Sequence, residues 1–340
     1  MNTVDVIVPC YRYGKYLRDC VASVLSQMDV EIRVLIIDDA SPDDSALVGA
    51  ALAKEDSRIT FLQHTENKGH IATYNEGIEW ATADYMLILS ADDFLLPGAL
   101  HRSVNIMDSH PEVGFTFGNV IVQSDTDIIS EAVKVSDDAD NAGLRILGGL
   151  DFIELSGSNN IVLTPSAVVR TKLQKRLGGY RPELPHSGDM EMWLRFAAHA
   201  SVGILDAYQA VYRLHATNMH SKYFGESWLP DLQQRKAALE CFFDNYSNVL
   251  PNPQQLHYKM FRSLSCLAVS KASTALNDGE IDISRKLSEL AIIVFPGVTR
   301  SLPWMKLICK RYLGNKVWRT LQPSVNKFRQ VSLLFKDRII

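Results

Sequence analysis

The chain has 340 residues, of which 46% are hydrophobic and 22% are charged. This composition is close to that of an average globular protein, which excludes disordered, collagen-like and low-complexity chains. The formal net charge of −4 argues against a general nucleic-acid-binding protein. A chain of this length is expected to form two domains, or one α/β domain with an extension.

The first hundred residues alternate short apolar runs with segments of helical periodicity. Buried strands are predicted at Val4–Pro9, Ile32–Ile37, Ile59–Leu62 and Tyr85–Leu89. Helices are predicted between them, over about 16–25, Ser45–Lys54 and Ile71–Ala81. Strands that alternate with helices favour a parallel sheet with helices on its faces. We therefore predict a doubly wound α/β fold.

The pattern changes twice further along the chain. Residues 113–215 are mixed, with apolar runs at Val113–Phe117 and Ile161–Leu163, a helix at Met190–Ala200 and a strand at Ala207–Arg213. From about Trp228 the pattern is helical to the end, interrupted by prolines and glycines. We place a domain boundary near residue 224, so that residues 1–224 form the α/β domain and residues 225–340 a mostly helical extension.

Two pairs of aspartates follow predicted strands. Asp38 and Asp39 follow the second strand, Asp92 and Asp93 follow the fourth, and Tyr11 follows the first. Doubly wound sheets bind ligands beyond the carboxyl ends of their strands, so these side chains should meet at one edge. Aspartates that only begin turns or cap helices are the alternative for either pair alone. Clustered carboxylates suit a hard cation such as Mg²⁺ or Mn²⁺, which typically bridges to phosphates, so the pattern predicts a nucleotide–metal site.

The sequence lacks the two common phosphate-binding loops. Only Gly14 follows the first strand, so there is no G-x-G-x-x-G loop, and G-x-x-x-x-G-K-[ST] does not occur. The five cysteines are scattered and form no C-x-x-C pair, which favours a reducing compartment over a disulfide framework or a zinc site. No signal peptide is visible, and no apolar stretch reaches the ~18 residues of a membrane span. We expect a cytoplasmic protein.

Seven segments together resemble a known family. They are, in chain order, Val6-Ile7-Val8-Pro9-Cys10-Tyr11, Ile36-Ile37-Asp38-Asp39-Ala40-Ser41, Asn67-Lys68-Gly69 with Asn75, Leu89-Ser90-Ala91-Asp92-Asp93, Gly178-Gly179-Tyr180, Gly188-Asp189 with Trp193-Leu194-Arg195, and Tyr212-Arg213-Leu214-His215. Their order and spacing resemble those of family-two inverting glycosyltransferases, over about residues 3–220. The resemblance implies the GT-A fold, a doubly wound mixed sheet with a nucleotide-sugar half over 1–110 and an acceptor half over 111–224.

The resemblance also implies a nucleotide site. Tyr11 would stack on the base, and the Asp39 carboxylate would accept the imide N–H of the base, which suits uracil and hence a UDP-sugar. The other nucleotide contacts implied by position are Pro9, Asn67, Gly69 and Asp92.

The same resemblance implies a metal site for Mn²⁺ or Mg²⁺. Asp92 and Asp93 match the D-x-D region of the family, and His215 matches a third metal ligand or a phosphate contact. From the sequence alone, His215 could equally be a structural or solvated histidine. Ser90 stands where the family usually has an aspartate, which leaves open which carboxylate binds the metal. Arg12 stands where asparagine is frequent, which leaves the choice of sugar open.

Asp189 matches the catalytic base of the family. On the sequence alone it would be a helix N-cap, and both roles are compatible. The processive members carry Q-x-x-R-W, whereas Gln209-Ala210-Val211-Tyr212-Arg213 is followed by Leu214, which argues for transfer of a single sugar. The segments Thr164-Pro165-Ser166 and Arg170 resemble the acceptor side, whose pocket is expected to involve the loops of residues 123–165.

The predicted function is a metal-dependent inverting glycosyltransferase. It would move one sugar from a nucleotide donor to a hydroxyl of a glycan or lipid-linked acceptor, in surface polysaccharide synthesis. One alternative is a sugar-nucleotidyltransferase, although the glycine-rich basic loop expected after its first strand is missing. Another is a degenerate family member that acts as a binding or scaffold protein. Ser90 favours that alternative, whereas the retained aspartates oppose it.

The C-terminal segment differs in charge from the rest of the chain. Residues 300–340 contain ten basic residues and one acidic residue, a net charge of +9, and residues 1–299 have a net charge of −13. The basic residues alternate with apolar ones at helical spacing, which predicts an amphipathic helix. Such a helix can lie on an anionic membrane surface, here the cytosolic face, or it can pack on the protein.

Overall fold

The computed structural model describes residues 2–124, 143–215, 218 and 227–314. It divides into two compact units, the first made of Met1–Lys222 and Ala237–Pro253 and the second of Tyr223–Lys236 and Gln254–Ile340. Helix α9 (Leu229–Tyr246) contributes to both units. The predicted boundary at residue 224 lies beside the first division, but residues 237–253 fall in the first unit, so the predicted domain limits stay a prediction.

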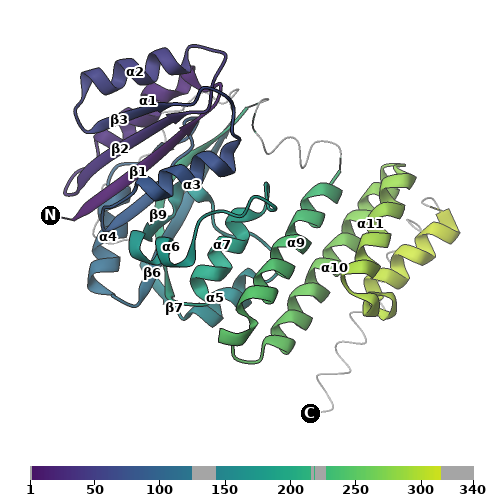
Figure 1. The fold of residues 1–340 in the computed structure, drawn as a ribbon. Helices are drawn as coiled ribbons and strands as arrows, with labels where there is room; N and C mark the ends of the chain where they lie inside the picture. Colours follow the sequence, from purple (N-terminus) through teal and green to yellow (C-terminus); the bar gives the residue numbers. More distant parts are fainter. Residues whose placement is uncertain (1, 125–142, 216–217, 219–226, 315–340) are drawn as a thin grey trace. The chain divides into compact units, whose positions relative to one another are not determined.

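The first unit contains a mixed sheet of nine strands among the described residues, in the order β3-β2-β1-β4-β8-β6-β9-β5, with β7 beside β9 (Figure 1). The strands are β1 (Thr3–Cys10), β2 (Glu31–Asp38), β3 (Ile59–Gln63), β4 (Tyr85–Ile88), β5 (Phe94–Leu95), β6 (Val113–Ser124), β7 (Gly143–Leu147), β8 (Val168–Arg170) and β9 (Ser201–Leu214). Strands β1 to β4 are parallel, and β8 is antiparallel to β4. This arrangement confirms the predicted α/β fold with a mixed sheet.

Helices cover the sheet. They are α1 (Gly14–Leu25), α2 (Ser45–Glu55), α3 (His70–Trp80), α4 (Ala99–Ser109), α5 (Gly149–Ser156), α6 (Thr171–Leu177) and α7 (Gly188–Ala197). The predicted helices therefore form, with ends that differ by a few residues. The predicted helix Met190–Ala200 begins two residues earlier, at Gly188.

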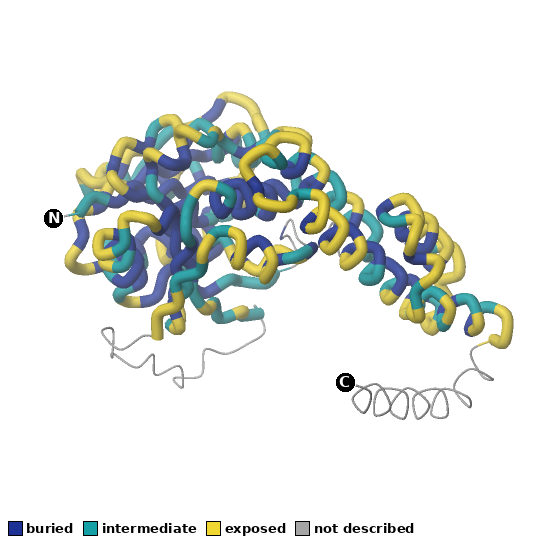
Figure 2. Tube along the Cα trace, turned by 90° about the horizontal axis from the view of Figure 1, so that it is seen from below, coloured by how far each residue is buried: buried dark blue, intermediate teal, exposed yellow. Residues whose placement is uncertain are grey.

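Strand β1 is buried on both faces, which explains why its residues other than Thr3 and the buried Asp5 are apolar. Val6 packs in one apolar cluster with Leu17 and Val21 of α1. On the opposite face, α3 approaches so closely that a Cβ on Gly77 would lie 2.3 Å from Ile7 Cγ2. Figure 2 shows the buried strands in dark blue inside helices whose outer faces are exposed. This double cover fixes β1 at the centre of the sheet, so its carboxyl end is held between those of β2 and β4.

Three short strands were not predicted, and one apolar run is not a strand. Strands β5 and β8 have two and three residues, too few to show a clear alternation, and β7 has no buried residue that would mark it as a strand. Residues 161–163 lie outside any strand and lead into the 3₁₀ helix η1 (Thr164–Ser166), whose Pro165 cannot donate to a sheet. The strand in this region is β8, which begins two residues after η1.

The second unit is helical, in agreement with the predicted helical C-terminal region. It contains α10 (Pro253–Asn277), α11 (Ile281–Val294), the 3₁₀ helix η3 (Pro296–Arg300) and a helix over 302–314. Ser265 of α10 donates a buried hydrogen bond of 2.7 Å to the carbonyl of Ala291 in α11. None of the described helices is both long and apolar enough to cross a lipid bilayer.

The described part of the basic segment makes contacts within this unit. Leu307 is buried, Lys310 donates to Ser273, and Arg311 donates to Ser284 and Ser288. Other apolar side chains of this helix are exposed, namely Leu302, Met305, Tyr312 and Leu313. The remaining predicted stripe, Val317, Trp318, Leu321 and Phe328, lies outside the described residues.

Candidate functional site

The carboxyl ends of β1, β2 and β4 place the predicted site residues along one edge of the sheet. The backbone N–H of Asp39 donates to the carbonyl of Cys10 at 2.9 Å, and the N–H of Ala91 donates to the carbonyl of Pro9 at 3.2 Å. These bonds join the ends of β2 and β4 to the end of β1. Pro9 itself is buried within β1, so it contributes its backbone to this junction.

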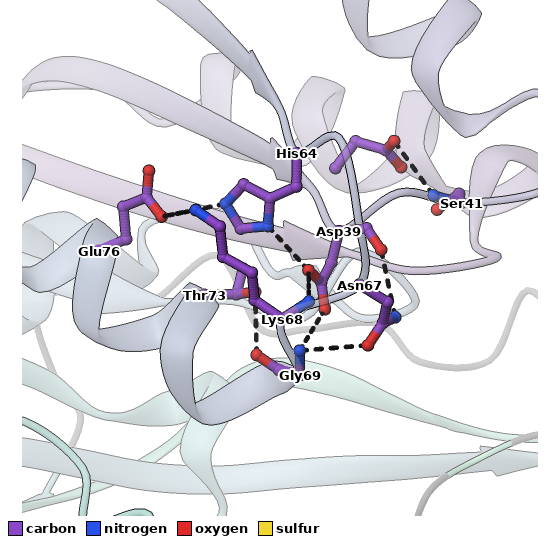
Figure 3. A network of polar contacts seen from close by, with 9 residues as sticks. Asp39, Ser41, His64, Asn67, Lys68, Gly69, Thr73 and Glu76 are labelled. Atoms are coloured by element: carbon purple, nitrogen blue, oxygen red, sulfur yellow. Dashed lines mark hydrogen bonds and ion pairs between the residues drawn. The ribbon is translucent and has the colours of Figure 1, made fainter.

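Asp39 lies at the centre of a hydrogen-bond network (Figure 3). Its Oδ1 is 2.7 Å from His64 Nδ1 and accepts the backbone N–H of Lys68 at 2.8 Å. Its Oδ2 accepts the N–H of Gly69 at 2.9 Å. Asn67 donates to the backbone carbonyl of Asp39 and accepts the N–H of Gly69 through its own side chain. Asn67 and Gly69 therefore hold Asp39 in place from the loop before α3.

The two aspartates of this first pair have different surroundings. Asp38 is fully buried, and its Oδ2 accepts the N–H of Ser41 at 3.2 Å. Its Oδ1 has no hydrogen-bond partner among the described residues. Only Asp39 belongs to the network around the loop of residues 67–69, so the structure separates the pair into a turn-forming residue and a candidate binding residue.

Tyr11 and Arg12 lie beside this network at the end of β1. Tyr11 is 38% exposed, which is compatible with a base that stacks on its ring. The Arg12 guanidinium lies 5.2 Å from the centroid of that ring. Arg12 has a φ of 65°, a left-handed conformation that asparagine adopts more readily than arginine.

Asp92 and Asp93 also differ from each other. Asp92 Oδ2 lies 3.0 Å from His215 Nε2 and accepts a hydrogen bond of 3.2 Å from Asn218 Nδ2. Asp92 Oδ1 is buried without a hydrogen-bond partner among the described residues. Asp93 Oδ1 instead accepts the backbone N–H of Arg213 at 3.0 Å. Burial and then the charge of Asp92 raise the pKa of Asp93 well above its ordinary value.

His215 is a buried member of this group. Its ring stacks on Tyr16 at 5.2 Å between centroids and meets the Tyr13 ring edge-on at 5.3 Å. Its side chain is only 3% exposed, so a solvated strand-end histidine does not describe it. Asn218 was missed by the sequence analysis because its contact with Asp92 bridges 126 positions along the chain.

Asp189 is the second residue of α7, and Ser187 holds the N-cap position. The alternative that Asp189 is the N-cap is therefore wrong. Its Oδ2 accepts a hydrogen bond of 2.8 Å from Asn160 Nδ2 and lies 3.4 Å from Thr164 Oγ1, while its Oδ1 accepts the N–H of Met190 at 2.9 Å. Burial raises the pKa of Asp189, although hydrogen bonds from Met190 and Asn160 and the charge of His186 act to lower it.

Tyr74 of α3 lies in an environment that three of the predicted site residues make acidic. Burial raises the pKa of its hydroxyl, and the charges of Asp92, Asp189 and Asp93 raise it further. A single hydroxyl thus lies within electrostatic reach of all three carboxylates. Tyr74 could not be identified as a site residue from the sequence, because a tyrosine inside a helix has no motif of its own.

A second tyrosine fixes the loop that leads to Asp189. Tyr180 packs edge-on against Tyr74 with centroids 5.1 Å apart. Its backbone N–H donates to Asn75 Oδ1 at 2.7 Å, and its carbonyl accepts from Asn75 Nδ2 at 2.9 Å. A Cβ on Gly179 would lie 2.2 Å from Asn75 Oδ1, which explains the glycine beside this pair.

The predicted metal site requires side-chain donors that could bind a divalent cation. Within residues 2–124, 143–215, 218 and 227–314, no group of three or more histidines, cysteines, aspartates or glutamates has a geometry that could hold a metal ion. Asp92 and His215 are nevertheless adjacent, and the unpartnered Oδ1 of Asp92 is the kind of donor that a hard cation prefers. The donor set is thus compatible with Mg²⁺ or Mn²⁺ through Asp92, whereas Asp93 is engaged by the backbone of Arg213.

Sequence similarity to known proteins covers part of the chain. Residues 5–159 match the family model of glycosyl transferase family 2. An uncharacterized protein of Mycobacterium tuberculosis, MT1568, is 27% identical over 208 residues, which cover 58% of this chain and 63% of that protein. The glycosyltransferase GlyG of Streptococcus pneumoniae is 35% identical over 115 residues, which cover 33% of this chain and 38% of GlyG. The matches thus span less than two thirds of these two relatives.

The fold is also similar to that of a solved structure with a bound nucleotide sugar. Residues 1–349 of TarS from Staphylococcus aureus, in a complex with UDP-GlcNAc, superpose with a TM-score of 0.56 and 15% sequence identity. The superposition covers 84% of this chain and 90% of that one. At this identity the likeness concerns the fold, and it agrees with the GT-A arrangement of the mixed sheet.

Proposed function

We propose that the protein transfers a sugar from a UDP-sugar to an acceptor hydroxyl, with inversion at the anomeric carbon, because residues 5–159 match the family model of glycosyl transferase family 2. The observation that carries the proposal is the placement of two carboxylates on separate segments: Asp92 Oδ2 lies 3.0 Å from His215 Nε2, and Asp189 Oδ2 accepts a hydrogen bond of 2.8 Å from Asn160. An inverting transfer needs one group that takes a proton from the acceptor and another that helps to stabilise the negative charge of the leaving diphosphate. These carboxylates come from separate segments and can divide those tasks.

Asp189 is the proposed base. Oδ1 and Oδ2 each accept a hydrogen bond, from Met190 and Asn160, and these bonds fix the plane of the carboxylate. Burial raises the pKa of Asp189, which makes its carboxylate a stronger proton acceptor than an exposed aspartate. The acceptor hydroxyl would lose its proton to Asp189 as its oxygen attacks the anomeric carbon from the face opposite the diphosphate. A single displacement needs no covalent enzyme intermediate.

Asp92, with His215 beside it, is proposed to hold a divalent cation, Mg²⁺ or Mn²⁺. When bound, the cation supplies positive charge that stabilises the departing diphosphate. Asp93 fixes the end of β9 through the backbone N–H of Arg213, two residues before His215. Asp93 would therefore position His215, while Asp92 would contact the cation.

The nucleotide is proposed to bind at the end of β1 and β2. Tyr11 offers an exposed ring for stacking, and Asp39 Oδ2 accepts only one hydrogen bond from the described residues, that of Gly69. A carboxylate oxygen can accept a second hydrogen bond. A base with an N–H on its pairing edge, such as uracil, would provide that donor.

Three further features complete the proposal. Leu214 in place of the tryptophan of processive members supports transfer of a single sugar. The acceptor is proposed to be a glycan or a lipid-linked sugar in surface polysaccharide synthesis. The net charge of +9 over residues 300–340 supports contact with the anionic cytosolic face of a membrane, where such an acceptor would lie.

A panel of nucleotide sugars, each incubated with the full chain and Mn²⁺, tests the proposal. We expect one UDP-sugar to be hydrolysed slowly without an acceptor and faster with one, and a chelator should stop both. A sugar-nucleotidyltransferase would instead require pyrophosphate, and a scaffold protein would turn over none of the donors. Either result would contradict the proposed transfer.

A further inference from the structure

His64 is buried between two carboxylates that belong to different elements. It directly follows β3, and its side chain is 2% exposed. Its Nδ1 lies 2.7 Å from Asp39 Oδ1, and its Nε2 lies 3.0 Å from Glu76 Oε2 on α3 (Figure 3). A buried histidine with a carboxylate at each ring nitrogen carries a desolvation cost that packing alone would not require. The two carboxylate contacts of His64 therefore indicate a role beyond packing.

The contacts form a closed ring of four residues. Lys68 Nζ lies 3.3 Å from the same Glu76 oxygen that faces His64, and the backbone N–H of Lys68 returns to Asp39 Oδ1. Burial acts to raise the pKa of Glu76, but the hydrogen bonds from Lys68 and His64 outweigh it and lower that pKa. Glu76 is thus an anion that can anchor the far side of the imidazole ring.

The two oxygens of Asp39 accept different numbers of hydrogen bonds from the residues that the structure describes. Oδ1 receives two donors, His64 Nδ1 and the N–H of Lys68, which occupy its two lone pairs. Oδ2 receives one donor, the N–H of Gly69. Carboxylate oxygens only accept, so the Asp39 contact requires a proton on His64 Nδ1. With that proton in place, the carboxylate is fixed in a plane that leaves one acceptor position on Oδ2.

From this asymmetry we propose that His64, anchored by Glu76, is the positioning residue that makes Asp39 selective for a nucleobase with a ring N–H at the centre of its pairing edge, as uracil has at position 3. The inference rests on the proposed function, because it assumes that Asp39 contacts the base. His64 does not touch the nucleotide. It acts by holding Oδ1, so that Oδ2 is presented to the base and the carboxylate cannot rotate.

Two substitutions separate the two ring nitrogens. His64→Asn places an amide N–H near the position of Nδ1 and can keep the bond to Asp39. His64→Gln places its amide near the position of Nε2 and loses that bond. The probes are UDP, whose uracil has an N–H at position 3, and CDP, whose cytosine has an acceptor there. Calorimetry in Mn²⁺ gives the affinity of each nucleotide for the full chain.

We expect wild type to prefer UDP over CDP, and His64→Asn to keep most of that preference. His64→Gln should lose about tenfold in UDP affinity, the usual value of one hydrogen bond to a charged group, with little change for CDP. A role in packing alone would weaken both nucleotides equally in both variants. Equal UDP-to-CDP ratios in wild type and a folded His64→Gln variant would overturn the inference. A wild type that does not distinguish UDP from CDP would overturn the proposed base contact of Asp39 and the inference with it.

A second variant avoids the buried position. Glu76 is partly exposed, so Glu76→Ala removes the anchor of His64 without opening the core. It should lower the UDP-to-CDP preference, in the same direction as His64→Gln. Glu79→Ala, on an exposed position of the same helix, is the matched control and should leave both affinities unchanged. If Glu76→Ala and Glu79→Ala bind both nucleotides as wild type does, Glu76 does not anchor His64 and the proposal is wrong as stated.

Discussion

Replacing Asp189 by asparagine tests the proposed base with little change in shape. The carboxylate accepts hydrogen bonds from Asn160 at 2.8 Å and from Met190 at 2.9 Å. The new amide oxygen can keep one of these bonds, and the Asn160 amide can turn its own oxygen toward the new NH₂ group. Loss of a negative charge in the first turn of a helix costs about 0.3–1 kcal/mol. Removing a desolvated charge acts in the opposite direction, so the free energy of unfolding should change by no more than about 1 kcal/mol.

The expected change in activity is much larger. An amide cannot take the proton of the acceptor hydroxyl, so the rate of transfer should fall by about 10²–10⁴, which is about 3–5 kcal/mol of activation free energy. The affinity for UDP should stay unchanged, because the proposed partner of Asp189 is the acceptor hydroxyl and not the nucleotide. Asp282→Asn is the matched control: Asp282 is also the second residue of its helix, α11, and its loss should not affect transfer. Wild-type turnover in Asp189→Asn, measured with saturating donor and acceptor, would refute the assignment.

The pH dependence gives an independent measurement on the same residue. Transfer requires the ionised form of Asp189, and burial raises the pKa of this carboxyl. As the pH falls, activity should therefore be lost at a higher pH than the ordinary titration of an aspartate would give. The residual activity of Asp189→Asn should lack this acidic limb. An acidic limb that persists unchanged in the variant would assign it to another group.

Three other predictions follow from the contacts around the site. Asp92→Ala should weaken UDP binding by about tenfold or more in Mn²⁺ and remove the effect of a chelator. Asp93→Asn keeps an acceptor for the N–H of Arg213, so it should lose less UDP affinity. Calorimetry that finds no effect of the cation on wild-type UDP binding would contradict this prediction. Arg12→Asn should raise the free energy of unfolding in urea by up to about 1 kcal/mol, because asparagine tolerates the positive φ, and an unchanged or lower value would contradict the strain. Full-length protein should float with anionic liposomes at low salt but not at high salt. A variant without residues 300–340 should stay in the soluble fraction at both salt concentrations. Full-length protein that stays in the soluble fraction at low salt would refute membrane contact.

The central strands could be predicted because each is buried on both faces. Residues of β1 from Val4 to Cys10 are all buried, so an apolar run was visible without knowledge of the partners. The placement of Tyr11, Asp39 and Asp92 at one edge then followed from the parallel order of the strands. The short strands β5 and β8 carry no such run, because their pairing is determined by β9, β6 and β4, which lie far away in the sequence.

The residues that support the site could not be predicted for a related reason. Two of these residues, Asn160 and Asn218, donate hydrogen bonds to aspartates that lie 29 or more positions away in the sequence. Tyr74 shares an electrostatic environment with the aspartates. A single polar residue in a loop or helix has no local pattern that marks such a contact. His64 had a weak signal, since it follows a buried strand directly, yet its two carboxylate partners come from other elements.

The two acidic pairs are each supported by one buried histidine, and the difference between these histidines separates their functions. His64 meets carboxylates at both ring nitrogens, so its ring is committed to Asp39 and Glu76 and cannot also be a metal ligand. His215 Nε2 lies 3.0 Å from Asp92 Oδ2, and its ring stacks on Tyr16 and meets Tyr13 edge-on. The first pair therefore has the features of a rigid acceptor for a neutral base, and the second those of the proposed cation site. Substitution at His64 should change which nucleotide binds, whereas substitution at Asp92 should change whether binding responds to a metal ion.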